Sequence, residues 1–120
     1  MPIHYKATLA SAILNQGKRE NGQQTTGEVY STYTKICERF NLSDLSQRRI
    51  GHIISELDMQ GLINAKIVSL GRQGRTKFIS VVLDENQVKE LFREDSFLSD
   101  IMDELTKTGN YIGSTQTRLV

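Results

Sequence analysis

Residues 46–83 read SQRRIGHIISELDMQGLINAKIVSLGRQGRTKFISVVL, and this stretch decides the fold. In its first half, apolar residues recur at positions i, i+3, i+4 and i+7, which is the spacing of a helix with one narrow apolar face. These residues are Ile50, Ile53, Ile54 and Leu57. Ser46 is a favoured helix N-cap, and Gly61 is a favoured helix end. The first half therefore predicts a helix over 47–60.

Two β-prone runs, 62–70 and 78–83, follow this helix. Both are rich in Ile and Val, which pack well on a pleated surface. The segment between them, 71–77, reads GRQGRTK, and its two glycines permit a tight turn. Three of its side chains are cationic. The pattern predicts a β-hairpin with a basic tip.

The chain upstream of this stretch predicts two more helices. Apolar residues at helical spacing place the first over 3–16, where Gly17 is suited to end it in a left-handed conformation. Residues 18–24 are polar and predict a loop. Thr25 and Glu28 then form a capping-box pattern, which begins a second helix. Three helices are therefore expected before the hairpin.

Downstream of the hairpin, two further amphipathic helices are expected. Asp84 with Gln87 can cap one, and Ser96 can cap the other. Residues 106–120 are polar and lack a clear period, which predicts a flexible tail after a domain of residues 1–105. The whole order predicts a winged helix-turn-helix: mainly α with a small β-hairpin, a three-helix core, a two-stranded wing and extra C-terminal helices.

Charge is unevenly distributed along the chain, although the formal net charge is only +1. Residues 46–77 hold six basic side chains against two acidic ones. Residues 84–104 hold eight acidic side chains against two basic ones. This separation predicts one face that meets a polyanion and another that repels it.

Composition excludes several classes of function. No apolar run approaches the roughly 20 residues that cross a bilayer, and no secretory signal is found, so we expect no membrane contact and a cytoplasmic, nucleoid-associated location. Cys37 is the single cysteine, which rules out an intramolecular disulfide and favours a buried apolar role. The two histidines form no metal-spaced cluster with it, so the sequence predicts no metal, no cofactor and no catalytic activity.

The basic segment contains residue types that read DNA. A helix fits the major groove, and its first turns approach the base edges, where Arg48 can bind guanine and Gln47 can bind adenine. A glycine-containing tip with Arg72 and Arg75 can enter a minor groove, while lysines of the strands meet phosphates. A basic helix face alone is more often a solvated surface, but here the hairpin adds a second cationic element. The candidate DNA-binding residues are Ser46, Gln47, Arg48, Arg49, His52, Ser55, Lys66, Arg72, Gln73, Arg75, Thr76 and Lys77.

Four segments, 25–30, 46–50, 54–63 and 71–77, resemble one family. They look like the C-terminal winged-helix domain of the archaeal replication initiators related to the eukaryotic origin recognition complex and cell-division-control loading factor. The resemblance implies binding to double-stranded origin DNA, with the replicative helicase or other initiator subunits as partners. It also implies an AAA+ ATPase domain in full-length members. This sequence has no GxxxxGK[ST] phosphate loop, so we expect no ATP hydrolysis from it.

Two other functions fit the same pattern. A stand-alone transcriptional regulator would use the same helix and hairpin but would dimerise, with the last helix as its interface, to read a palindrome. A protein-interaction module would contact a partner such as a helicase through the acidic C-terminal helices. For the initiator module we expect a monomer or a weak dimer.

Overall fold

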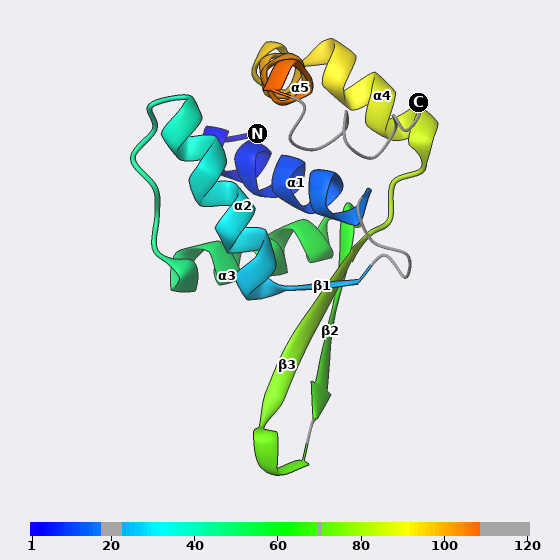
Figure 1. Cartoon of the computed structure of the whole chain (residues 1–120). Helices are drawn as coiled ribbons and strands as arrows, with labels where there is room; N and C mark the ends of the chain where they lie inside the picture. Colours follow the sequence, from blue (N-terminus) through cyan, green and yellow to red (C-terminus); the bar gives the residue numbers. More distant parts are fainter. Residues whose placement is uncertain (18–22, 70, 109–120) are drawn as a thin grey trace.

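The computed structural model describes residues 1–17, 23–69 and 71–108, and it is mainly helical with a small antiparallel sheet (Figure 1). The predicted winged-helix fold is confirmed, because a two-stranded wing projects from a three-helix core and two helices follow it. The elements are α1 (Ile3–Gln16), β1 (Gln24–Thr25), α2 (Thr26–Arg39), α3 (Gln47–Met59), β2 (Ile63–Ser69), a 3-10 turn (Gly71–Gln73), β3 (Arg75–Val81), α4 (Glu85–Glu94) and α5 (Ser96–Thr108).

Helix α1 runs through the centre of the molecule and contacts α2, α3, β3 and α5 (Figure 1). Small buried side chains such as Ala7 and Ala10 let these neighbours approach closely. The predicted left-handed end at Gly17 is wrong, because its φ of −62° is right-handed. The Gly17 N–H instead continues the helical pattern and donates to the Ile13 carbonyl at 3.2 Å. Glycine permits a left-handed conformation but does not require one.

A short third strand, β1, was missed because residues 18–24 were predicted to be a loop. Residues 18–22 lie outside the described part of the chain, but Gln24 pairs with Ile79 on β3, which gives the sheet order β1-β3-β2. The Gln24 side chain is buried, and its amide donates to the Ala12 carbonyl at 2.9 Å and accepts from Asn15 at 2.8 Å. These bonds satisfy a polar side chain that hydropathy assigns to the surface.

The second strand of the wing is shifted from its predicted position, because β3 runs over Arg75–Val81 rather than over 78–83. Arg75 pairs with Ser69 at the outer end of the ladder. Gly71 and Gly74 both have positive φ, at 67° and 88°, so the turn depends on residues without a Cβ. Three residues assigned to the basic tip, 75–77, are therefore strand residues whose side chains alternate between two faces.

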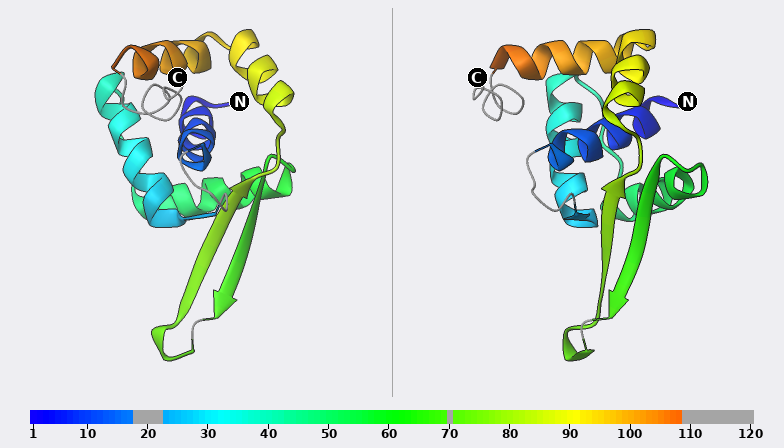
Figure 2. Two further views of the ribbon diagram at one scale, coloured as in Figure 1. Left: turned by 45° about the vertical axis from the view of Figure 1, so that its right-hand side comes forward. Right: turned by 90° about the vertical axis from the view of Figure 1, so that its right-hand side faces the viewer.

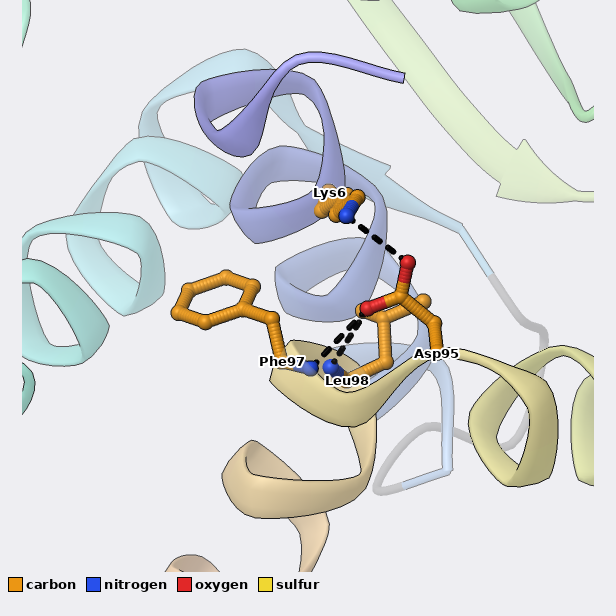
Figure 3. Close-up of polar contacts among 4 residues, drawn as sticks. All are labelled: Lys6, Asp95, Phe97 and Leu98. Atoms are coloured by element: carbon orange, nitrogen blue, oxygen red, sulfur yellow. Dashed lines mark hydrogen bonds and ion pairs between the residues drawn. The ribbon is translucent and has the colours of Figure 1, made fainter.

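The C-terminal helices are anchored to the core by capping and by an ion pair. Asp84 and Gln87 form the predicted capping box of α4. The predicted cap of α5 at Ser96 is wrong, because Asp95 Oδ1 accepts from the backbone N–H groups of Phe97 and Leu98 at 3.0 and 3.1 Å (Figure 3). The other carboxylate oxygen of Asp95 lies 2.8 Å from the Lys6 ammonium, which lowers the pKa of Asp95.

Helix α5 ends at Thr108 and so extends past the domain boundary predicted at residue 105. Residues 109–120, the rest of the predicted tail, lie outside the described part of the chain. The domain boundary stays a prediction.

Candidate nucleic-acid interface

Helix α3 buries one face and exposes the opposite one, as its apolar spacing predicts. Ile50, Ile53, Ile54 and Leu57 are at most 4% exposed. Ser46 caps the helix by accepting from the Arg49 N–H at 3.2 Å. The candidate residues of this segment, Ser46, Gln47, Arg48, Arg49, His52 and Ser55, are all exposed. The first turns of α3 are thus ordered by the cap and open to a ligand.

Two tyrosines of α2 hold the connection that leads into α3. The Tyr30 hydroxyl donates to the Leu45 carbonyl at 2.9 Å, and the Leu45 N–H donates to the Tyr33 hydroxyl oxygen at 2.8 Å. Both backbone polar groups of Leu45, its N–H and its carbonyl, are therefore fixed one residue before the Ser46 cap. Tyr33 also lies 2.8 Å from His4 Nδ1, and burial raises the pKa of Tyr33, so the phenol stays neutral.

Neither tyrosine was predicted to be a positioning residue. They lie three positions apart on α2, which is also the spacing of ordinary core residues. The signal in the sequence is that both carry a hydroxyl, because a buried tyrosine hydroxyl normally finds a hydrogen-bond partner.

The wing and α3 form one continuous surface. Lys77 on β3 donates from Nζ to Ser55 Oγ on α3 at 3.4 Å. Because direct partners and alternate residues in a ladder share a face, Lys77 and Arg75 lie on the same wing face as the buried Ile79. Part of the predicted site is thus brought together: the exposed side of α3 with Arg75 and Lys77.

Other candidate residues lie elsewhere. Lys66 pairs with Phe78 and Thr76 pairs with Val68, which places Lys66 and Thr76 on the opposite face of the wing. Arg72 is exposed at the tip. The side chain of Gln73 lies outside the described part of the structure, so its predicted role stays a prediction.

Arg49 lies on a different flank of α3 from Ser55. The Tyr5 hydroxyl of α1 donates to Glu56 at 2.5 Å, and this bond raises the pKa of Tyr5 while the nearby Arg49 charge opposes the shift. At 100° per residue, Arg49 and Glu56 share one flank of α3, whereas Ser55 lies about 100° away. The structure thus places Arg49 beside α1 rather than beside the wing.

The cations of α3 and the wing are available for a ligand. Within residues 1–17, 23–69 and 71–108, the ion pairs join Lys6 to Asp95, Arg39 to Glu104 and Lys89 to Glu85. None of these involves a basic residue of α3 or the wing. The acidic helices α4 and α5 lie at the end of the molecule opposite the wing tip (Figure 2).

The described residues contain no group of three or more His, Cys, Asp or Glu side chains placed to hold a metal. Cys37 is buried, and burial raises the pKa of its thiol, so it stays protonated. No described helix has both the length and the apolar character that a membrane span requires.

The three-helix core with its wing defines a winged helix-turn-helix protein. Residues 1–91 match the family described as "CDC6, C terminal winged helix domain", and the chain belongs to this family. The predicted resemblance is therefore confirmed.

The curated relatives are longer proteins. The ORC1-type DNA replication protein of Thermococcus onnurineus is 42% identical over 104 residues, which cover 85% of this chain and 24% of that protein. The ORC1-type DNA replication protein of Pyrococcus abyssi is 41% identical over 111 residues, 91% of this chain and 26% of that protein. The chain thus spans about a quarter of the length of these relatives.

Two solved structures share the fold. The Aeropyrum pernix Orc1 protein in complex with DNA has a TM-score of 0.71 at 34% identity, covering 84% of this chain and 26% of that one. Cdc6p from Pyrobaculum aerophilum has a TM-score of 0.60 at 17% identity, covering 87% of this chain and 24% of that one. The second likeness supports the fold alone.

Proposed function

We propose that this chain binds double-stranded DNA at replication origins through α3 and the wing, as the winged-helix part of a replication initiator. The observation that carries the proposal is the contact between Lys77 and Ser55, which joins two exposed cationic elements into one surface. The related Aeropyrum pernix Orc1 protein was solved in complex with DNA, which supports the same ligand here.

The first turns of α3 enter the major groove. Arg48 binds guanine through its two-pronged guanidinium, and Gln47 binds adenine or a phosphate. His52 and Ser55, one to two turns further on, contact the sugar-phosphate backbone. The N–H groups at the start of the helix attract a phosphate, because they lack partners within the helix.

The wing enters an adjacent minor groove with its tip first. Arg72 at the tip meets the high negative potential of the groove. Arg75 and Lys77 project from one face of the ribbon and Lys66 from the other. Cations on both faces can neutralise phosphates on both walls of the groove, which a hairpin with all its charge on one face cannot do.

The chain supplies DNA recognition rather than catalysis in this proposal. The helicase or other initiator subunits are proteins that it would meet at the origin, in the cytoplasm with the nucleoid. We expect a monomer or weak dimer in sedimentation, whereas a regulator that reads a palindrome would form a stable dimer.

The test is a titration of labelled origin-repeat and scrambled duplexes at several salt concentrations. For each phosphate that is neutralised, affinity is expected to fall by about 0.9 logarithmic units per tenfold increase in salt. If Lys66, Arg72, Arg75 and Lys77 each neutralise one phosphate, log affinity against log salt should have a slope of roughly −4. Binding that is absent or insensitive to salt contradicts the proposed function. Equal affinity for the two duplexes keeps DNA binding but rejects origin recognition.

A further inference from the structure

Helix α4 lies between two surface grooves. Phe92 is the one buried side chain of α4, whereas Val88 and Leu91 are half-buried. Leu91 lines a groove of about 350 Å³ together with Leu62 and Leu83 from the base of the hairpin. Val88 lines a second groove, of about 380 Å³, between α4 and α5. The two grooves have similar volumes and apolar floors.

The charges around the grooves differ. Asp84, Glu90 and Glu94 line the first groove, and no Lys or Arg lines it. The second groove has both signs, with Lys89, Arg93 and Asp103 among its lining residues. Glu90 and Glu94 take part in none of the ion pairs found among the described residues. Of these two grooves, the first is the one that combines an apolar floor with negative charge that no described ion pair neutralises.

The first groove is also separate from the DNA-binding surface. Helix α4 and the wing tip lie at opposite ends of the molecule (Figure 2). The backbone N–H of Val82 donates to the Leu62 carbonyl at 3.1 Å, which fixes the floor to the base of the wing. A molecule in this groove leaves α3 and the wing tip uncovered.

We propose that the groove between α4 and the hairpin base binds a basic, leucine-containing peptide segment of another protein. One or two aliphatic side chains of the segment fill the floor formed by Leu62, Leu83 and Leu91. Its Lys or Arg side chains meet Glu90 and Glu94, which complements the charge of the groove. A nucleic acid does not fit, because its phosphates would meet the same carboxylates. The chain would then hold DNA at one end and a protein at the other.

The probe is a short synthetic peptide of alternating leucine and lysine residues, titrated into the isotope-labelled protein without DNA. The expected result is that backbone amide chemical shifts change at Leu62, Leu83 and Leu91 and not around Val88 and Met102. A peptide with glutamate in place of lysine should leave all of these shifts unchanged. Shift changes centred on the second groove, or equal binding of the acidic peptide, overturn the proposal.

The variant is Glu90→Gln with Glu94→Gln, which removes charge from two exposed side chains and keeps their size. It should weaken peptide binding about tenfold or more, which corresponds to about 1.4 kcal/mol. The matched control, Asp103→Asn in the second groove, should bind like the original protein. Unchanged binding by the double variant overturns the proposal.

A second copy of this chain is the rival occupant. If it fills the groove, the shifts of Leu62, Leu83 and Leu91 will depend on protein concentration in the absence of peptide, and the assignment to another protein fails. The Glu90→Gln and Glu94→Gln variant should also keep its DNA affinity. Failure of this proposal is therefore distinguishable from failure of DNA binding.

Discussion

The two ends of this molecule use the same charged residue types in different ways. Within the described part of the acidic end, two cations are paired and Arg93 is not: Lys89 lies 3.8 Å from Glu85, and Arg39 lies 3.3 Å from Glu104. At the end formed by α3 and the wing, Arg48, Arg72 and Arg75 are exposed and in no ion pair among the described residues. The cations of α3 and the wing are therefore available to a ligand, whereas the unpaired Arg93 lies on a helix that also carries Glu90 and Glu94.

The net charge hides this difference. A formal charge of +1 is unremarkable for a protein of this size, yet residues 46–77 carry +4, residues 84–104 carry −6 and the rest of the chain carries the remaining +3. Such an arrangement orients the molecule before contact, because a polyanion attracts one end and repels the other. Altering one end while the other serves as the control tests this difference.

The largest effect is expected from Arg72→Ala combined with Arg75→Ala. Each substitution removes a charge-assisted hydrogen bond to a phosphate, so DNA binding should be weaker by about 2 to 4 kcal/mol. The slope of log affinity against log salt should become shallower by about two. Fluorescence anisotropy with a labelled duplex measures both quantities.

The control for this pair is Arg39→Ala at the paired end. It removes a cation that already binds Glu104, so DNA affinity should not change. If Arg39→Ala weakens binding as much as the wing variant does, overall charge rather than the wing surface governs affinity.

A somewhat smaller effect is expected from Arg48→Ala. Loss of a contact to a guanine edge should cost about 1 to 3 kcal/mol on the preferred duplex and less on a scrambled one. Arg49→Ala is the matched comparison, because Arg49 lies on the α1 flank of the same helix turn. It should reduce affinity for both duplexes slightly and equally. If Arg49→Ala instead has the larger effect, and mainly on the preferred duplex, the side of α3 that reads bases is the side that faces α1.

The helices and the wing were predictable because they depend on local rules. The stripe from Ile50 to Leu57 and the capping box at Thr25 each follow from spacing along one helix. The hairpin was predictable for the same reason, because the helical spacing of apolar residues ends at Gly61 and two β-prone runs follow. Each of these signals is complete within a few neighbouring residues.

The missed features depend on contacts between distant segments. Gln24 is a strand residue because Asn15 and the Ala12 carbonyl satisfy its amide. Asp95 is the α5 cap, and its second oxygen binds Lys6 on α1. Lys66 lies on the far face of the wing because of the register of β2 against β3, which the turn length sets. Local patterns in a single sequence do not show which distant residues come into contact.

The ion pair that anchors α5 gives a stability prediction. Asp95→Ala removes both the helix cap and the partner of Lys6, which should lower the free energy of unfolding by about 1 to 2 kcal/mol. Asp95→Asn keeps a capping side chain and should lose less. Urea unfolding at pH 7 followed by circular dichroism measures the difference.

The same pair predicts a dependence on pH. The hydrogen bond from Lys6 lowers the pKa of Asp95 in the folded state, so its contribution is fully present above the unfolded-state pKa and is lost as pH falls through the folded-state pKa. The gap in stability between the original protein and Asp95→Asn should therefore be constant near neutrality and should shrink below a pH of about 4. A gap that stays constant into strong acid means that the carboxylate charge contributes nothing.

The smallest effect is expected from neutralising the acidic end with Asp100→Asn and Asp103→Asn. The molecule is 42 Å long, and charges on α5 lie far from the wing tip (Figure 2). At about 0.1 M salt the screening length is about 10 Å, so DNA bound by the wing hardly senses these carboxylates and affinity should not change. At about 0.01 M salt the screening length is about 30 Å, and affinity for any duplex should rise, by no more than about twofold. A large gain at the higher salt concentration would mean that the acidic helices lie against the DNA, and the two ends would then not be separate in function.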